Sequence, residues 1–181
     1  MQDEPAERAA ALGLQVRKIW PQGKALEVTF RDDEGVFSPE EYEQVKSAIK
    51  DYANIWTQHA NISFVFTDNQ FETGVIRVSF TRGKGHNSYI GTDCATAVES
   101  HSFPTTNFDP NEINGRTLTT NSERFRQVVL HEFGHVLGCI HEHSQPNTKF
   151  KWNEAKVYEF YNQEYGWSRE RTKVNVLRRY K

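Results

Sequence analysis

The stretch HEFGHVLGCIHE, residues 131–142, is the most informative part of this chain. His131 and His135 are four residues apart, so on a helix their side chains project from one face, one turn apart. That spacing suits two imidazoles that bind one metal ion. Glu132 lies between them in sequence, where its carboxylate can approach a metal-bound water without taking a ligand position. The pattern therefore predicts a helix that carries a metal site.

The residues after this pair extend the pattern. Gly138 has no Cβ, so it suits a sharp turn at the end of the helix, and that turn brings His141 back toward the same ion. Three neutral imidazoles with one open position are typical of a catalytic zinc site. The alternative is an ordinary helix with HExxH by chance. The longer pattern argues against it, as do apolar residues at helical spacing: Phe125, Val128, Val129, Phe133, Val136, Leu137 and Ile140.

The extended motif resembles that of the metzincin metallopeptidases. Glu142, directly after the third histidine, resembles the astacin branch in particular. Segments 18–21 (KIWP), 75–80 (VIRVSF) and 88–94 (SYIGTDC) are similar to stretches of astacin-like and matrixin-like catalytic domains. The resemblance covers about residues 16–180. It implies an α+β fold: a twisted, mostly parallel sheet with an antiparallel edge strand, two long helices and a small irregular C-terminal lobe.

The sequence departs from the astacin pattern in two places. Residues 143–146 read HSQP, where astacins usually have an arginine- and aspartate-rich sequence. The only methionine is Met1, so the Met-turn that lies beneath the zinc site in the family has no counterpart in these 181 residues. We expect either that the turn lies beyond residue 181 or that the protein lacks it. The tyrosine ligand that astacins take from that turn cannot be assigned.

Length and composition predict one ordinary globular domain. A chain of 181 residues, 36% hydrophobic and 25% charged, can bury a real core. The net charge of −2 gives no reason to expect nucleic acid or an anionic membrane as a partner. No apolar run approaches the roughly 20 residues that span a bilayer. The sequence does not indicate an oligomeric state.

The predicted domain organisation follows from the N-terminal composition and from the motif. Residues 1–17 contain no apolar h-region, so we interpret them as a tail or pro-segment remnant and not as an intact signal peptide. Residues 18–181 are predicted to form the catalytic domain, with an upper lobe to about residue 138 and a lower lobe at 139–181. The family resemblance implies secretion, and the sequon at residues 61–63 adds weak support.

Cys94 and Cys139 allow at most one disulfide and do not identify a redox compartment. Two buried thiols are the plainer interpretation, and a disulfide or a redox-sensitive Cys139 are the alternatives. Three histidines already complete the ligand set, so we do not expect Cys139 to bind the metal.

Patterning and capping residues predict the remaining elements. Ser38, Pro39 and Glu41 form a capping signature for a helix that runs to about residue 59. Asn153 and Gly166 bound a second helix at 154–165, and a shorter helix follows from Ser168 to about residue 180. Strands are predicted at 25–30, 62–67 and 75–81.

Residues 82–121 are rich in glycine and proline, and a long irregular stretch inside a compact domain is often functional. The family resemblance implies that an edge strand at about 88–92 pairs with the backbone of an extended protein or peptide substrate. His86, Asp93 and His101 could line that cleft or hold a second ion. Solvent-exposed loop residues are the plainer interpretation of all three.

The function implied is that of a zinc-dependent endopeptidase, with His131, His135 and His141 as ligands of one Zn²⁺. Glu132 is then the general base that takes a proton from the metal-activated water and later delivers it to the leaving amine. The alternative is a zinc-bound but catalytically impaired peptide-binding module, which the missing Met-turn motivates and the presence of Glu132 disfavours. A zinc amidase acting on a non-protein amide would share the same site.

Overall fold

The computed structural model describes residues 15–32, 34–67, 74–96, 103–112, 120–144, 149 and 151–179. The chain divides into two compact units, a larger one at Arg17–Cys139 and a smaller one that contains Ile140–Lys181. The larger unit carries the sheet and two long helices, and the described part of the smaller unit is helical.

A five-stranded sheet in the order β2-β1-β3-β5-β4 organises the larger unit. All neighbouring strands are parallel except β4, which pairs antiparallel with β5 at the edge. This confirms the predicted α+β fold with a mostly parallel sheet and an antiparallel edge strand. The bounds are Lys24–Arg31 (β1), Ile62–Thr67 (β2), Ile76–Ser79 (β3), Asn87–Ser88 (β4) and Thr106–Asn107 (β5).

Strand β1 has partners on both sides, and its side chains explain its place inside the sheet. Leu26, Val28 and Phe30 alternate along one face and are all buried. Alternate residues of a strand share a face, so this spacing turns one continuous apolar row toward the core. Val28 lies opposite Phe66 of β2 and Ile76 of β3.

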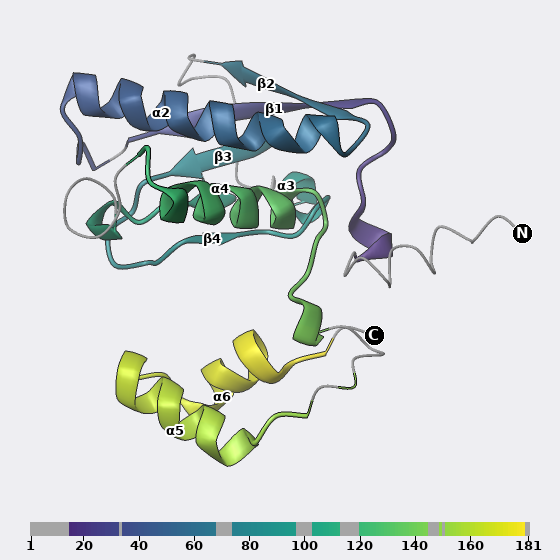
Figure 1. Cartoon of the computed structure of the whole chain (residues 1–181), viewed down its shortest axis with the longest axis vertical. Helices are drawn as coiled ribbons and strands as arrows, with labels where there is room; N and C mark the ends of the chain where they lie inside the picture. The colour runs from purple at the N-terminus through teal and green to yellow at the C-terminus, as the bar shows by residue number, and fades with distance from the viewer. Residues whose placement is uncertain are drawn as a thin grey trace, which may run out of the picture. The chain divides into compact units, whose positions relative to one another are not determined.

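The two long helices are α2 (Pro39–Ala53) and α4 (Glu123–Val136), which run side by side across one face of the sheet (Figure 1). The predicted capping box at the start of α2 is present: the Ser38 hydroxyl accepts from the Glu41 N–H, and the Glu41 carboxylate accepts from the Ser38 N–H. The helix predicted to reach residue 59 becomes a 3-10 helix, η2 (Asn54–Gln58), over its last turn.

Aromatic side chains join the helices to the sheet. The Phe64 ring of β2 meets the Phe133 ring of α4 edge-on, with centroids 5.1 Å apart. Tyr52 of α2 packs against Phe125 of α4 in the same manner at 6.3 Å. Such edge-to-face pairs are favoured geometries that fix how two elements face each other. The core therefore holds α4 against both the sheet and α2.

The glycine- and proline-rich stretch contains short elements that buried polar groups hold in place. They are α3 (Asp93–Thr96), η4 (Pro110–Glu112) and the two-residue strands β4 and β5. The Asn107 amide oxygen accepts from the Ser79 hydroxyl and the Thr81 N–H, and its NH₂ donates to the Gly85 carbonyl. Buried backbone groups need hydrogen-bond partners. The Asn107 side chain supplies partners where longer strands would have formed backbone hydrogen bonds with each other.

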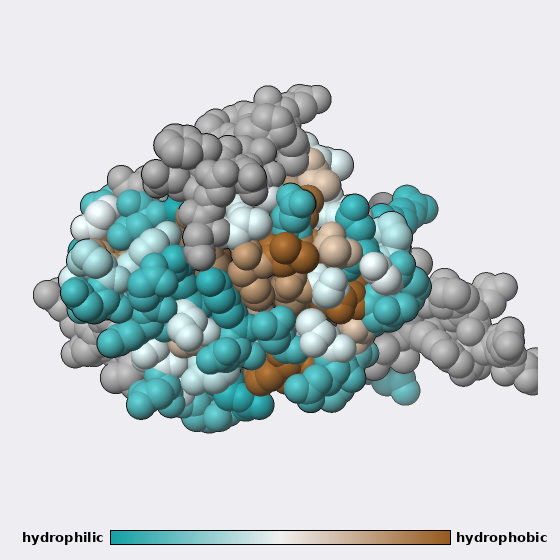
Figure 2. All heavy atoms as spheres, turned by 90° about the horizontal axis from the view of Figure 1, so that it is seen from above, coloured by the Kyte–Doolittle hydropathy of each residue, from teal (hydrophilic) through white to brown (hydrophobic). Residues whose placement is uncertain are grey.

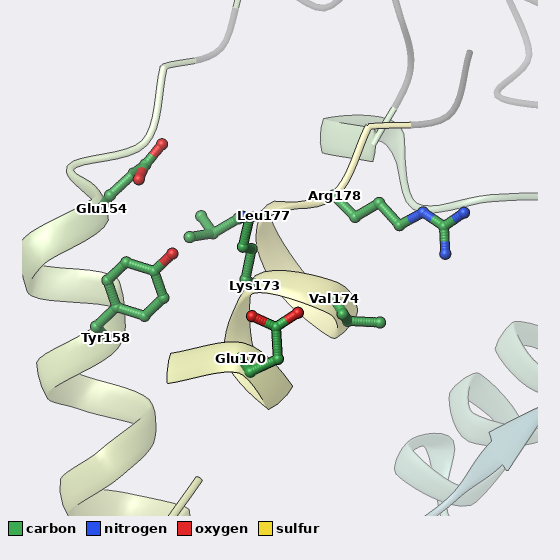
Figure 3. A pocket seen from close by; sticks show the side chains of 7 residues that line it. All are labelled: Glu154, Tyr158, Glu170, Lys173, Val174, Leu177 and Arg178. Carbon is green, nitrogen blue, oxygen red and sulfur yellow. The ribbon is translucent and has the colours of Figure 1, made fainter. Parts of the chain in front are cut away.

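The smaller unit consists of α5 (Glu154–Tyr165), α6 (Arg169–Thr172) and a π-helical turn, η6 (Lys173–Leu177), after the short η5 (Glu142–Ser144). The predicted caps Asn153 and Gly166 are confirmed, and Gly166 has a left-handed φ of 63°. The last predicted helix ends at Leu177 rather than near residue 180. A pocket of about 290 Å³ opens between α5 and α6–η6, lined in part by Tyr158 and Leu177 (Figure 3).

On the face seen in Figure 2, most described residues are hydrophilic, and apolar residues gather near the middle and at the lower edge. Isolated exposed apolar side chains, such as Val65 in the edge strand β2, are ordinary on protein surfaces. Among the described residues, no helix has the length and apolar character needed to cross a membrane.

Candidate metal centre

Helix α4 positions the first two histidines of the motif. The Ser122 hydroxyl caps its start by accepting from the Phe125 N–H at 3.0 Å. The buried side of the helix faces the core, with Phe125, Val129, Phe133 and Val136. His131 is exposed and His135 is partly buried. The apolar spacing that predicted the helix thus leaves both imidazoles outside the core.

The two imidazoles point at each other in a way that suits a shared ion. Their Nε2 atoms are 3.1 Å apart. Two nitrogen ligands about 2.0–2.1 Å from a tetrahedral zinc ion would lie roughly 3.3 Å apart. The His135 Nδ1–H donates to the Cys139 carbonyl at 2.8 Å, which leaves the lone pair on Nε2. These residues therefore fit a zinc ion.

The turn after α4 has the conformation that the sequence predicted. Leu137 ends the helix, and Gly138 follows with φ of 105°, a value that side chains with a Cβ rarely adopt. The Gly138 and Cys139 N–H groups donate to the carbonyls of His135 and Gly134, both at 2.9 Å. The turn therefore carries the chain sharply away from the helix axis and supplies hydrogen-bond donors to carbonyls in the last turn of the helix.

The third histidine of the motif belongs to the same cluster. One ligand atom each of His131, His135 and His141 lies within 4.8 Å of the others, and this is a group that could hold a metal ion. His143 is not part of it. Its ring stacks on His141 with centroids 5.3 Å apart and meets Trp152 edge-on at 5.3 Å.

Partial desolvation by the surrounding protein lowers the pKa of both helix histidines, although the His131 side chain is largely exposed. For His131, the proximity of His135 lowers the pKa further. For His135, the hydrogen bond to the Cys139 carbonyl opposes the effect of burial. Because an imidazole binds a metal in its neutral form, these shifts keep the ligands ready for the ion at neutral pH.

Glu132 is buried, with 5% of its surface exposed. Its Oε2 atom has no hydrogen-bond partner among the described residues. Burial alone raises the pKa of this carboxyl to about 8. A buried carboxyl without a partner is costly, and groups with strongly shifted pKa values concentrate at functional sites. In sequence Glu132 directly follows His131, and in the structure it is one of the buried residues of α4.

Of the other candidate residues, Asp93 and His86 are described, and neither belongs to the three-histidine group. Asp93 pairs with Lys18, and the His86 Nδ1 accepts from the Asp109 N–H at 3.2 Å. His101 lies outside the described residues, as does the side chain of Glu142. Cys94 is a buried free thiol and Cys139 a partly buried one, which favours the two-thiol interpretation.

Sequence patterns did not indicate the partners that support α4 from outside. The Trp56 and Trp20 indole N–H groups donate to the carbonyls of Leu130 and Val136, at 3.0 and 2.7 Å. The Gly91 N–H donates to the His135 carbonyl at 2.8 Å. Trp20 and Gly91 lie in segments singled out only by family resemblance, because a contact over 116 residues leaves no local signal.

The structure is similar to two solved structures of myroilysin. The first is 33% identical, with a TM-score of 0.76 over 92% of this chain and 73% of that one. The second is 34% identical, with a TM-score of 0.61 over 88% of this chain and 63% of that one. A hatching-enzyme zinc protease from Oryzias latipes is 16% identical with a TM-score of 0.39, too distant to support an argument. No curated protein sequence matches this chain.

Fold and site together define a metallopeptidase with a metzincin-like α+β fold. The family model for Matrixin matches residues 20–163, which is most of the chain. This protein belongs to the matrixin family. A peptidase of this family with a three-histidine group uses one catalytic Zn²⁺.

Proposed function

We propose that this protein is a zinc-dependent endopeptidase in which His131, His135 and His141 hold the ion and Glu132 is the general base. The single observation that carries the proposal is the buried Glu132 carboxyl, which has an unpartnered oxygen and follows directly after His131. Zinc binding alone needs no such group, whereas peptide hydrolysis needs a base that moves a proton.

The ion would act as a Lewis acid on the scissile carbonyl and would make water a nucleophile near neutral pH. Glu132 would accept the proton of that water and return it to the leaving amine. Burial raises the pKa of this carboxyl to about 8 in the metal-free protein, and the charge of the bound ion would lower it, so the carboxylate would be free to take a proton. His135 would keep its ring orientation through the hydrogen bond to the Cys139 carbonyl.

The substrate in this proposal is a protein or peptide in extended conformation. Strand β4 is the last strand of the sheet, so among the described residues one of its sides has no strand neighbour. An extended chain can add to such an edge through main-chain hydrogen bonds. The astacin-like subtype, which rests on Glu142, and secretion, which rests on resemblance, belong to the same proposal.

Cleavage of an unfolded protein by the zinc-loaded chain tests the proposal. Glu132→Ala should abolish cleavage, a loss of at least 100-fold for removal of a general base, while zinc binding is retained. Glu123→Gln is the matched control, because Glu123 lies on the exposed first turn of the same helix. It should cleave like the unmodified chain.

Two outcomes would contradict the proposal. Cleavage that survives Glu132→Ala would remove Glu132 from the role of base. Full zinc occupancy without cleavage by the unmodified chain would favour the catalytically impaired peptide-binding module instead.

A further inference from the structure

The C-terminal end of α4 is held by residues that do not belong to the three-histidine group. The last carbonyls of any helix lack partners within the helix. Here the Val136 carbonyl accepts from the Trp20 indole N–H at 2.7 Å, and the His135 carbonyl accepts from the Gly91 N–H at 2.8 Å. Both donors come from outside the helix, and both act on the turn that carries His135.

These two donors are tied to each other. The Lys18 carbonyl accepts from the Thr92 N–H at 2.9 Å, and the Lys18 ammonium pairs with the Asp93 carboxylate. The segment that carries Trp20 is thereby fixed to the loop that carries Gly91. A Cβ at Gly91 would overlap the Lys18 carbonyl oxygen, and its φ of +53° also favours glycine. The contact between the two segments is therefore too close for any other residue.

The same segments lie against the turn after the helix. A Cβ at Gly138 would meet the Lys18 carbonyl oxygen at 3.5 Å and the Ile19 side chain at 3.6 Å. The next residue, Cys139, supplies the carbonyl that orients the His135 ring. Lys18 and Ile19 thus border the turn that sets where this carbonyl lies.

We propose that Lys18, Trp20, Gly91 and Asp93 form a clamp that sets the position of the His135 imidazole through the end of α4. This inference rests on the proposed zinc site. None of the four belongs to the three-histidine group, so they are positioning residues and not ligands. Groups that orient a metal ligand typically change metal affinity about 10–100-fold when they are removed.

The charged pair makes the clamp testable without unfolding the protein. The side chains of Lys18 and Asp93 are 29% and 35% exposed, and ion pairs this close to solvent contribute little to stability. A change in zinc affinity after Asp93→Asn would therefore report on position and not on general loss of structure. Trp20→Phe is the stronger variant, because it keeps an aromatic ring and removes the indole N–H that reaches Val136. It also removes part of a buried ring, so the unfolding measurement is needed beside it.

The experiment measures zinc affinity by competition with a chelator, the visible spectrum of the cobalt(II)-substituted protein, and unfolding of the metal-free protein. We expect Trp20→Phe to weaken zinc binding about 10–100-fold and to shift the cobalt bands. Asp93→Asn should also weaken zinc binding and shift the cobalt bands, but by less than Trp20→Phe does. Lys18→Arg, which keeps the pair, should bind zinc like the unmodified chain. Glu123→Gln, at the other end of α4, is the control for a general effect on the helix.

Unchanged zinc affinity and an unchanged cobalt spectrum in both Trp20→Phe and Asp93→Asn would overturn the clamp while the proposed function stands. If Trp20→Phe does not fold, Asp93→Asn and Lys18→Arg decide the matter by the same measurements. If the unmodified chain binds no zinc, the proposed function fails, and the clamp's role fails with it.

Discussion

Glu132, the proposed general base, has a pKa that burial shifts far from its usual value. A carboxyl in water is ionised at neutral pH, but this one is 5% exposed, and burial raises its pKa to about 8. Its unpartnered oxygen marks a place where the fold accepts a local cost. Such costs are tolerated where the group has a function to perform.

The raised pKa predicts how stability depends on pH in the metal-free protein. A folded pKa of about 8 lies above the reference value of 4.5, so the folded state binds a proton that the unfolded state has lost between those values. The contribution of this carboxyl to the free energy of unfolding is fully present below about pH 4.5 and is lost as the pH rises through about 8. Glutamine cannot ionise, so a glutamine at this position would keep its contribution to stability at every pH.

Glu132→Gln should therefore stabilise the metal-free protein at pH 8–9 relative to the unmodified chain. The expected difference is a few kcal/mol, at about 1.4 kcal/mol for each pKa unit. Urea unfolding in the presence of a chelator, at several pH values, measures it. A difference that stays constant from pH 4.5 to 8.5 would show that the carboxyl is ionised in the folded state.

At the scale of elements, α4 has two ends with different roles. Its start is fixed locally by the Ser122 cap, and its end is fixed by Trp20 and Gly91 from distant segments. Both ligand histidines lie in the second half of the helix. Loss of the cap should therefore weaken the helix without moving the imidazoles.

Ser122→Ala should lower the free energy of unfolding by about 1 kcal/mol, a typical cost of losing an N-cap. Zinc affinity should stay within about twofold of that of the unmodified chain, because the lost hydrogen bond lies at the far end of the helix. A loss of about 1.4 kcal/mol in the free energy of zinc binding would instead lower the affinity tenfold. Denaturant unfolding and chelator competition on the same samples provide both numbers. A large loss of zinc affinity would mean that the two ends of α4 are coupled.

At the scale of the whole molecule, the metal should act as a stabilising ligand. Zinc that binds the folded state and not the unfolded one adds about 2.7 kcal/mol at a free concentration 100 times its Kd. For a protein of this length that corresponds to a rise in Tm of roughly 5–10 °C.

Thermal unfolding with zinc and with a chelator measures this rise. His135→Ala removes one ligand and should abolish the zinc-dependent rise, while the metal-free Tm changes much less because the side chain is only partly buried. An equal rise in the variant would mean that zinc binds elsewhere in the chain.

Local rules were enough to predict several features from the chain: the strand at Ile62–Thr67, the capped helices α2 and α5, the turn at Gly138 and the histidine motif. Capping, periodicity and turn chemistry act over a few residues, so they can be read along the chain. The short β4 and β5 gave no such pattern, because two residues show no periodicity and their pairing depends on Asn107 and its buried partners. The burial of Glu132 and the hydrogen bond from Trp20 to Val136 could not be predicted in this way, because burial and contacts over 116 residues arise only when distant segments pack together.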